Sequence, residues 1–85
     1  MKPVAERFGR YRGKIRWRVV VEHIPKCASF GYRIRIDGVT IGADRQNPDG
    51  KLFGQFDTES AAIEAGQADA INRAEQALRT IRSKR

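Results

Sequence analysis

The stretch "KIRWRVVV", residues 14 to 21, alternates cations with large apolar residues and ends in three valines. Successive side chains of a β-strand point to opposite faces, so this period of two predicts a strand with one basic and one apolar face. We extend the strand over residues 14 to 24, because Pro25 has no backbone donor with which to continue a ladder. The apolar face then needs a cover, and the basic face is left to solvent or to a partner.

A second strand with the same pattern follows. In "FGYRIRI", residues 30 to 36, aromatic residues and isoleucines alternate with Arg33 and Arg35. The next two residues are Asp-Gly, a pair that readily adopts the positive φ values of a type I′ hairpin turn. We therefore expect residues 39 to 41 to pair back on the second strand. A Pro- and Gly-containing loop over residues 42 to 50 should lead to a further short strand.

The C-terminal third of the chain has the features of one amphipathic helix. Thr58 is placed to cap it, and Glu59 suits the positive end of the helix dipole. Gly66 and Gln67 fall near the apolar stripe, where they mark either a close approach to the sheet or a less regular first section of the helix. The sequence thus predicts an α+β fold, a three- or four-stranded antiparallel sheet packed on one long C-terminal helix. The expected interior is Trp17, Val19, Val21, Tyr32, Ile34, Ile36, Phe56, Ile63, Ala70, Ala74 and Leu78.

The length of 85 residues allows one small domain. We expect a basic flexible arm over residues 1 to 13, a single sheet-plus-helix domain over residues 14 to 82, and a frayed basic tail over residues 83 to 85. The arm is expected to be flexible because it mixes Arg and Gly with two aromatics and shows neither helical nor strand period.

The net charge of +7 is unevenly distributed. Residues 1 to 35 contain ten Lys or Arg against two acids, residues 36 to 72 two against seven, and residues 73 to 85 five against one. A basic, acidic, basic order favours contact with a polyanion through the two ends. The alternative is that the charges serve solubility and pair with one another inside the fold.

Several classes of function are not expected. The lone Cys27 rules out an intramolecular disulfide framework and suggests a reducing compartment. No signal-peptide core and no apolar run of membrane-spanning length occurs, so we expect a cytoplasmic protein without a membrane partner. His23 is expected to be a packed or edge residue, and Asp44 and Asp49 fit turn chemistry better than calcium binding. Without a nucleophile, metal-ligand or phosphate-loop motif, we expect a non-enzyme with no cofactor.

The basic strand faces are the candidate binding site. If the helix covers the apolar face, the cations of both strands are left on the other, where arginine can grip phosphate or a guanine edge. Phe8 and Tyr11 in the arm can stack on unpaired bases. We expect DNA or RNA binding with weak sequence preference. A small protein-interaction module that docks on an acidic partner is the alternative, and the oligomeric state stays open. The candidate nucleic-acid contacts are Arg10, Arg12, Lys14, Arg16, Arg18, Arg33 and Arg35.

One segment resembles a known family. "LFGQFDTESAAIEA", residues 52 to 65, is similar to the strand-to-helix junction of AP2-type DNA-binding domains and of the related arm-binding domains of phage integrases, and "YRG", residues 11 to 13, resembles the start of the AP2 pattern. The resemblance implies a three-stranded sheet that reads the major groove with a helix packed behind it. It also implies that Arg12, Arg16 and Trp17 are among the DNA contacts. The matching junction positions are Gly54, Phe56, Asp57, Thr58 and Ala62.

Overall fold

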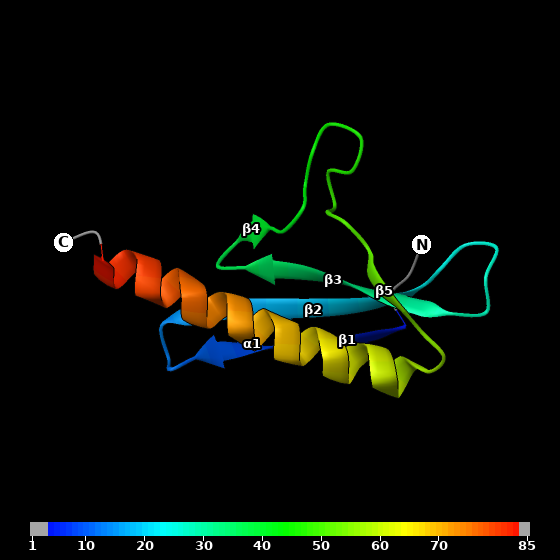
Figure 1. Ribbon diagram of the computed structural model, residues 1–85, viewed down its shortest axis with the longest axis horizontal. Helices are drawn as coiled ribbons and strands as arrows, with labels where there is room; N and C mark the ends of the chain where they lie inside the picture. Colours follow the sequence, from blue (N-terminus) through cyan, green and yellow to red (C-terminus); the bar gives the residue numbers. More distant parts are fainter. Residues whose placement is uncertain (1–3, 84–85) are drawn as a thin grey trace.

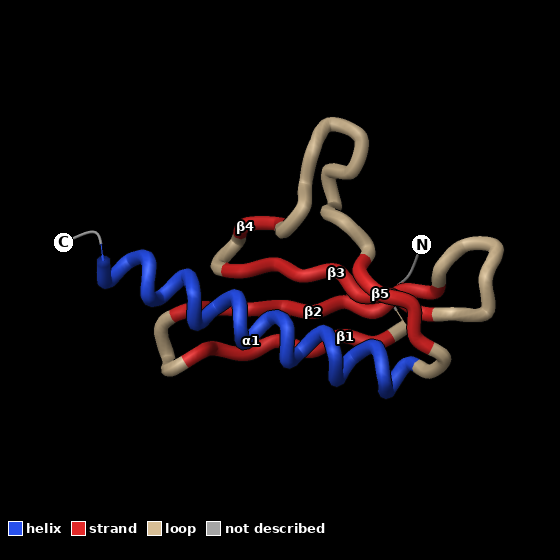
Figure 2. Tube along the Cα trace, in the orientation of Figure 1, coloured by secondary structure: helices blue, strands red, loops and turns tan. Residues whose placement is uncertain are grey.

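The computed structural model describes residues 4–83, which form one five-stranded antiparallel sheet with a single helix lying across one of its faces (Figures 1 and 2). Residues 1–3 of the expected arm and residues 84–85 of the expected tail lie outside this range. The predicted α+β class, an antiparallel sheet packed on one C-terminal helix, is confirmed. The elements are β1 (Ala5–Tyr11), β2 (Ile15–His23), β3 (Phe30–Ile36), β4 (Val39–Thr40), β5 (Phe53–Phe56) and α1 (Glu59–Ser83).

β1 corrects the expectation of a flexible arm. Ala5–Tyr11 pairs with β2 along its whole length, so the sheet begins well before residue 14. The chain reverses at Arg12 and Gly13, whose φ angles are 51° and 67°, and the next amide donates to the Tyr11 carbonyl oxygen at 3.0 Å. Positive φ at both central residues is the geometry of a type I′ hairpin turn. The arginine-rich N-terminal segment is therefore an edge strand of the domain.

β2 and β3 form the centre of the sheet, as their alternation predicts. They pair antiparallel over the full length of β3, with Trp17 opposite Ile36. Asp37 and Gly38, with φ angles of 48° and 85°, make the expected tight turn into β4. β4 pairs with the C-terminal end of β3 and β5 with its N-terminal end, on the side away from β2. The strand order is thus β1-β2-β3-β4, with β5 beside β3.

α1 begins at the predicted cap and lies close to the sheet. Thr58 Oγ1 accepts a hydrogen bond from the Ala61 N–H at 3.1 Å, which satisfies one of the amides that a helix start leaves unpaired. Gly66 faces the sheet, and a Cβ atom at this position would stand 2.4 Å from Val19 Cγ1. Of the two alternatives for this part of the helix, the close approach to the sheet is therefore the one observed. α1 also continues through Ser83, the first residue of the expected tail.

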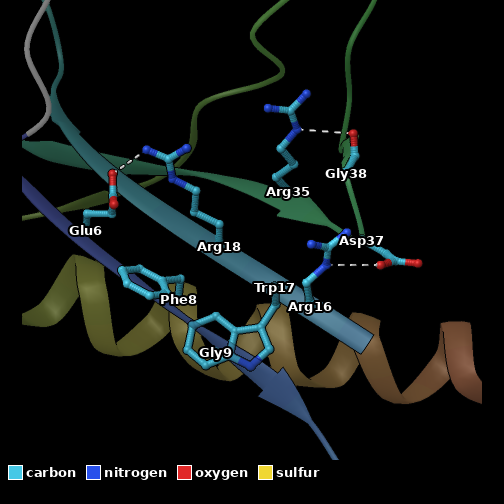
Figure 3. A pocket seen from close by; sticks show the side chains of 9 residues that line it. All are labelled: Glu6, Phe8, Gly9, Arg16, Trp17, Arg18, Arg35, Asp37 and Gly38. Atoms are coloured by element: carbon cyan, nitrogen blue, oxygen red, sulfur yellow. Dashed lines mark hydrogen bonds and ion pairs between the residues drawn. The ribbon is translucent and has the colours of Figure 1, made fainter. Parts of the chain in front are cut away.

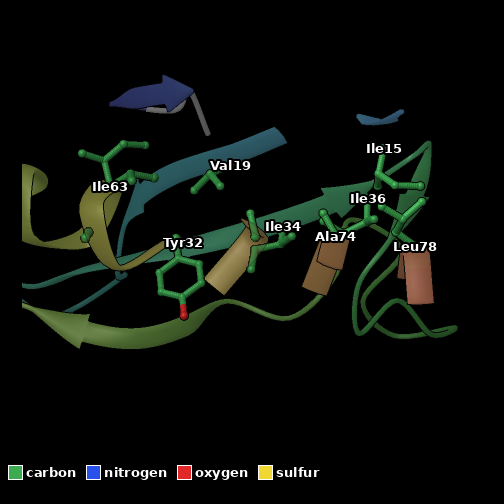
Figure 4. Packing of buried hydrophobic residues seen from close by; sticks show 11 residues of the cluster. Ile15, Val19, Tyr32, Ile34, Ile36, Ile63, Ala74 and Leu78 are labelled. Atoms are coloured by element: carbon green, nitrogen blue, oxygen red, sulfur yellow. The ribbon is translucent and has the colours of Figure 1, made fainter. Parts of the chain in front are cut away.

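The core lies between α1 and the sheet (Figure 4). Ile34 and two valines of β2 are fully buried, and each such burial contributes about 1.5–3 kcal/mol before entropy is counted. Trp17 and Phe56, expected inside, are only partly buried. The indole of Trp17 lies instead against Gly9 of β1, where a Cβ atom would come within 2.8 Å of the ring. The buried apolar residues are Ile15, Val19, Val21, Tyr32, Ile34, Ile36, Ala62, Ile63, Ala70, Ala74 and Leu78.

Candidate functional site

The face of the sheet away from α1 is here called the open face. Val19 and Val21 of β2 are buried beneath the helix, so the residues between and beside them point the other way. Residues that pair directly on neighbouring strands point to the same face of the sheet. Phe8 of β1 and Arg35 of β3 both pair with Arg18, so they lie on the open face as well. The open-face side chains of the three long strands are Glu6, Phe8, Arg10, Arg16, Arg18, Val20, Glu22, Arg33 and Arg35.

The open face has two pairs of arginines in which the two members lie directly opposite each other on neighbouring strands. Arg10 of β1 pairs with Arg16 of β2, and Arg18 of β2 pairs with Arg35 of β3. Side chains directly opposite on neighbouring strands have Cβ atoms about 4.5–5.5 Å apart, so like charges at such positions destabilise a sheet. The open face therefore concentrates positive charge in an arrangement that opposes folding.

Carboxylates lie among these arginines (Figure 3). Arg18 Nη2 is 2.5 Å from Glu6 Oε2, and Arg16 Nε is 3.7 Å from Asp37 Oδ1. The carboxylate of Glu6 on this face was not anticipated, because Glu6 belongs to the segment that was expected to be a flexible arm. Both ion pairs are weak, because the side chains of Arg16 and Arg18 are 69% and 50% exposed.

Arg33 is held more firmly than the other arginines. Its Nε donates to Glu22 Oε2 at 2.6 Å, and its Nη1 donates to the carbonyl oxygen of Gly50, at the end of the 42–50 loop. Its side chain is only 26% exposed and that of Glu22 only 15%. Arg33 thus ties the loop to the sheet, and it has less freedom to reach a ligand than its exposed neighbours.

The remaining cations of the candidate site gather at the β1–β2 hairpin. Arg10 lies near the end of β1, and Arg12 and Lys14 lie in the turn. All three are exposed, and the Arg12 guanidinium lies 5.6 Å from the centroid of the Tyr11 ring. Within the described part of the chain, none of the three forms an ion pair. Arg12 turns to the helix side, where it lines a depression with Tyr11 and residues of α1 that include Glu75. Arg10 is therefore the open-face cation of the hairpin that is least neutralised.

The open face is hollowed beside Phe8. Phe8 is 75% exposed, whereas Tyr11, expected to act with it, lies on the helix side and packs against the core. The face has two neighbouring depressions, one beside Phe8 and another of about 340 Å³. Arg18 and Arg35 line both, so they lie between the two depressions. The depression beside Phe8 has a volume of about 410 Å³ and is lined by Glu6, Phe8, Gly9, Arg16, Trp17, Arg18, Arg35, Asp37 and Gly38 (Figure 3).

His23 contacts an aromatic ring, and Cys27 contacts polar side chains. His23 is exposed at the end of β2 and contacts Phe30 edge to face, with ring centroids 5.4 Å apart. A hydrogen bond with the Ser29 side chain lowers the pKa of the Cys27 thiol, and Gln55 Nε2 contributes by donating to Sγ at 3.4 Å. Among the described residues, no group of three or more His, Cys, Asp or Glu side chains is placed to hold a metal ion.

A polar contact between sheet and helix was missed by sequence reasoning. The Tyr32 hydroxyl donates to Asp69 Oδ2 at 2.8 Å, and Arg73 Nε donates to Asp69 Oδ1 at 3.0 Å. Burial raises the pKa of Tyr32 to about 12, and the neighbouring Asp69 carboxylate acts in the same direction. The only signal in the sequence was the spacing of Asp69 and Arg73 by one helical turn. This contact joins β3 to α1 and lies on the side of the sheet away from the open face.

Comparison of the chain with protein-family models, with curated proteins and with solved structures finds no match. The resemblance to AP2-type domains therefore stays a hypothesis, and function has to be argued from the site. Over the described residues, no helix has an apolar stretch long enough to cross a membrane.

Proposed function

We propose that the open face binds DNA or RNA with weak sequence preference. The observation that carries this proposal is the presence of two pairs of opposed arginines, Arg10 with Arg16 and Arg18 with Arg35. A phosphate placed between two such guanidiniums replaces their repulsion with charge-assisted hydrogen bonds. Release of counterions from the nucleic acid favours the contact further.

The cations of the candidate site are expected to make different contributions to binding. Arg16, Arg18 and Arg35 form the centre of the contact, and Arg10 extends it to the β1–β2 hairpin, where Lys14 adds positive charge. Arg12, which faces α1, contributes only through the field of the hairpin. Exposed ion pairs contribute only about 0–1 kcal/mol, so Arg16 and Arg18 can exchange their carboxylate partners for a phosphate at small cost, while Glu6 and Asp37 keep their negative charge on the face. Arg33 adds to the positive field while it holds the 42–50 loop.

A titration of labelled duplex and single-stranded oligonucleotides at about 50 mM and 200 mM salt tests the proposal. We compare the wild type with Arg16→Ala/Arg35→Ala, which removes two charges from the open face. The matched control is Arg7→Ala/Arg45→Ala, which removes the same charge from the helix side of β1, where Arg7 donates to Gln67, and from the 42–50 loop.

We expect wild-type affinity to fall steeply with salt. For the open-face variant we expect weaker binding and a log–log salt slope shallower by about 0.7–0.9 for each phosphate that the variant no longer neutralises, with the control close to wild type. Absence of wild-type binding at low salt would reject the proposal. So would an equal loss of affinity in the two variants, because the open face would then act only through the overall charge of the protein.

A protein-interaction module is the second candidate, and the outer edge of β1 favours it. Within the described residues β1 pairs only with β2. The Asp37 N–H donates to the Arg16 carbonyl at 2.6 Å, so the backbone N–H and C=O of Arg16 point towards β3. Because these groups alternate in direction along a strand, those of Trp17 point towards β1. Gly9, opposite Trp17, therefore bonds inward, and Phe8 presents its backbone groups outward, where an extended peptide of an acidic partner can add a strand.

Phe8→Pro tests this second candidate, because proline removes the outward donor and is tolerated on an edge strand. A partner protein that stays bound after nuclease treatment and is released by Phe8→Pro would favour strand addition. Release of every partner on nuclease treatment would count against it.

A further inference from the structure

Phe8 is an aromatic side chain left open on a basic face. At 75% exposure it is the one aromatic among the exposed large apolar residues in the described part of the chain. An aromatic side chain typically buries about 150–250 Å² when it is covered, which makes an uncovered ring a strong contact point. A single exposed apolar residue needs no explanation by itself, so its surroundings decide what it can do.

Two arginines continue the row that Phe8 begins across the sheet. Phe8 stands opposite Arg18, and Arg18 stands opposite Arg35, on three neighbouring strands. Strands lie about 4.8 Å apart, so the ring and the two guanidiniums start from evenly spaced positions across the sheet. All three line the depression of about 410 Å³ (Figure 3). A stacking platform flanked by backbone-binding cations is the arrangement that holds single-stranded nucleic acid.

The carboxylates of the same depression distinguish a single strand from a duplex. Glu6 and Asp37 line it together with Phe8, so a duplex laid on this face would set its closely spaced phosphates against two negative charges. An intact duplex also keeps the faces of its bases stacked inside the helix, where Phe8 cannot reach them. An unpaired base offers both a ring face for Phe8 and exposed amino groups that can donate to carboxylates.

We infer that the open face takes single-stranded nucleic acid, with one unpaired base stacked on Phe8 in the depression and the adjoining phosphates bound by Arg18 and Arg35. This inference rests on the proposed function of the open face. It adds to that proposal the class of substrate and the residue that selects it.

Three probes of one sequence test the inference, each prepared in DNA and RNA form. They are a short single strand, its duplex, and the same single-stranded backbone with abasic positions throughout, which keeps the phosphates and removes every base. The proteins are the wild type, Phe8→Ala, and Phe8→Tyr, which keeps a ring. Val39→Ala, a change of another exposed apolar residue, is the matched control. Circular dichroism establishes that each variant is folded.

We expect the wild type to bind the single strand more tightly than either other probe. Phe8→Ala should lower affinity for the single strand by about 5- to 150-fold, the usual range for one stacked base. It should leave binding to the abasic backbone and its salt slope unchanged, and Phe8→Tyr and Val39→Ala should behave as wild type.

Two results would overturn the inference while the proposed function stands. One is a Phe8→Ala variant that binds the single strand as tightly as wild type. The other is a wild type that binds the duplex or the abasic backbone as well as the single strand. If the wild type binds none of the probes at low salt, the proposed function fails as well, and the inference fails with it.

Discussion

Arginines that look alike in the sequence have different surroundings in the folded chain. Arg16 is 69% exposed and has one carboxylate 3.7 Å away, whereas Arg33 is 26% exposed and is held by both Glu22 and Gly50. The alternating pattern of β2 and β3 predicted the face that each arginine occupies. It contained no information on which arginine would be fixed by hydrogen bonds to other segments. The loop that supplies Gly50 returns from 17 residues away, and no local pattern records that contact.

Gly66→Ala is predicted to destabilise the fold. Alanine is a better helix former by about 1 kcal/mol, but its Cβ would stand 2.4 Å from Val19 Cγ1 and 3.0 Å from Tyr32 Cγ. Both neighbours are buried, and overpacking a core typically costs about 1–3 kcal/mol. We therefore expect a net decrease of up to about 2 kcal/mol in the free energy of unfolding, measured by urea denaturation.

The matched control for Gly66→Ala is Asn72→Ala, at an exposed position of the same helix. It should be neutral or slightly stabilising, because it gains helix propensity without a clash. A Gly66→Ala variant at least as stable as wild type would mean that helix and sheet are farther apart at this point than described.

At the scale of elements, β1 shows where sequence patterns lose their information. The positions of β1 that face the helix include Arg7, which reaches Gln67, and Gly9, which makes room for Trp17. Neither residue is apolar, so the strand has no apolar period of two to detect. β2, β3 and the start of α1 were predictable because their inward positions are apolar and Thr58 provides a cap. The ion pair of Glu6 with Arg18 was missed together with β1.

The contact between β3 and α1 through Tyr32 predicts a pH dependence. The pKa of Tyr32 is raised to about 12 from the ordinary value of 10.0, so between these values the unfolded chain loses this proton and the folded chain keeps it. The stabilisation from Tyr32 is thus fully present below pH 10 and is lost as the pH rises towards 12. Denaturation of wild type and Tyr32→Phe should show a difference in stability that shrinks over this interval. A difference that stays constant would contradict the assigned hydrogen bond to Asp69.

At the scale of the whole molecule, the uneven charge of the sequence becomes a difference between surfaces. The basic first 35 residues supply all three long strands apart from Ile36, and most of the arginines on these strands lie on the open face. The acidic middle segment forms the 42–50 loop and the first half of α1, which lies against the other face (Figure 1). A polyanion is therefore attracted to one side of the molecule, and that side is the one the core leaves uncovered.

Mapping of backbone amide chemical shifts during addition of a single-stranded oligonucleotide tests the central claim most directly, because it locates the contact without any substitution. If the open face is the binding site, the largest shifts fall on β1, β2 and β3 around Phe8, Arg18 and Arg35, and on the β1–β2 hairpin, while the second half of α1 stays unchanged. Shifts that centre on α1 or on the outer side of β4, or spectra that do not change at low salt, would contradict the assignment of the open face as a nucleic-acid site.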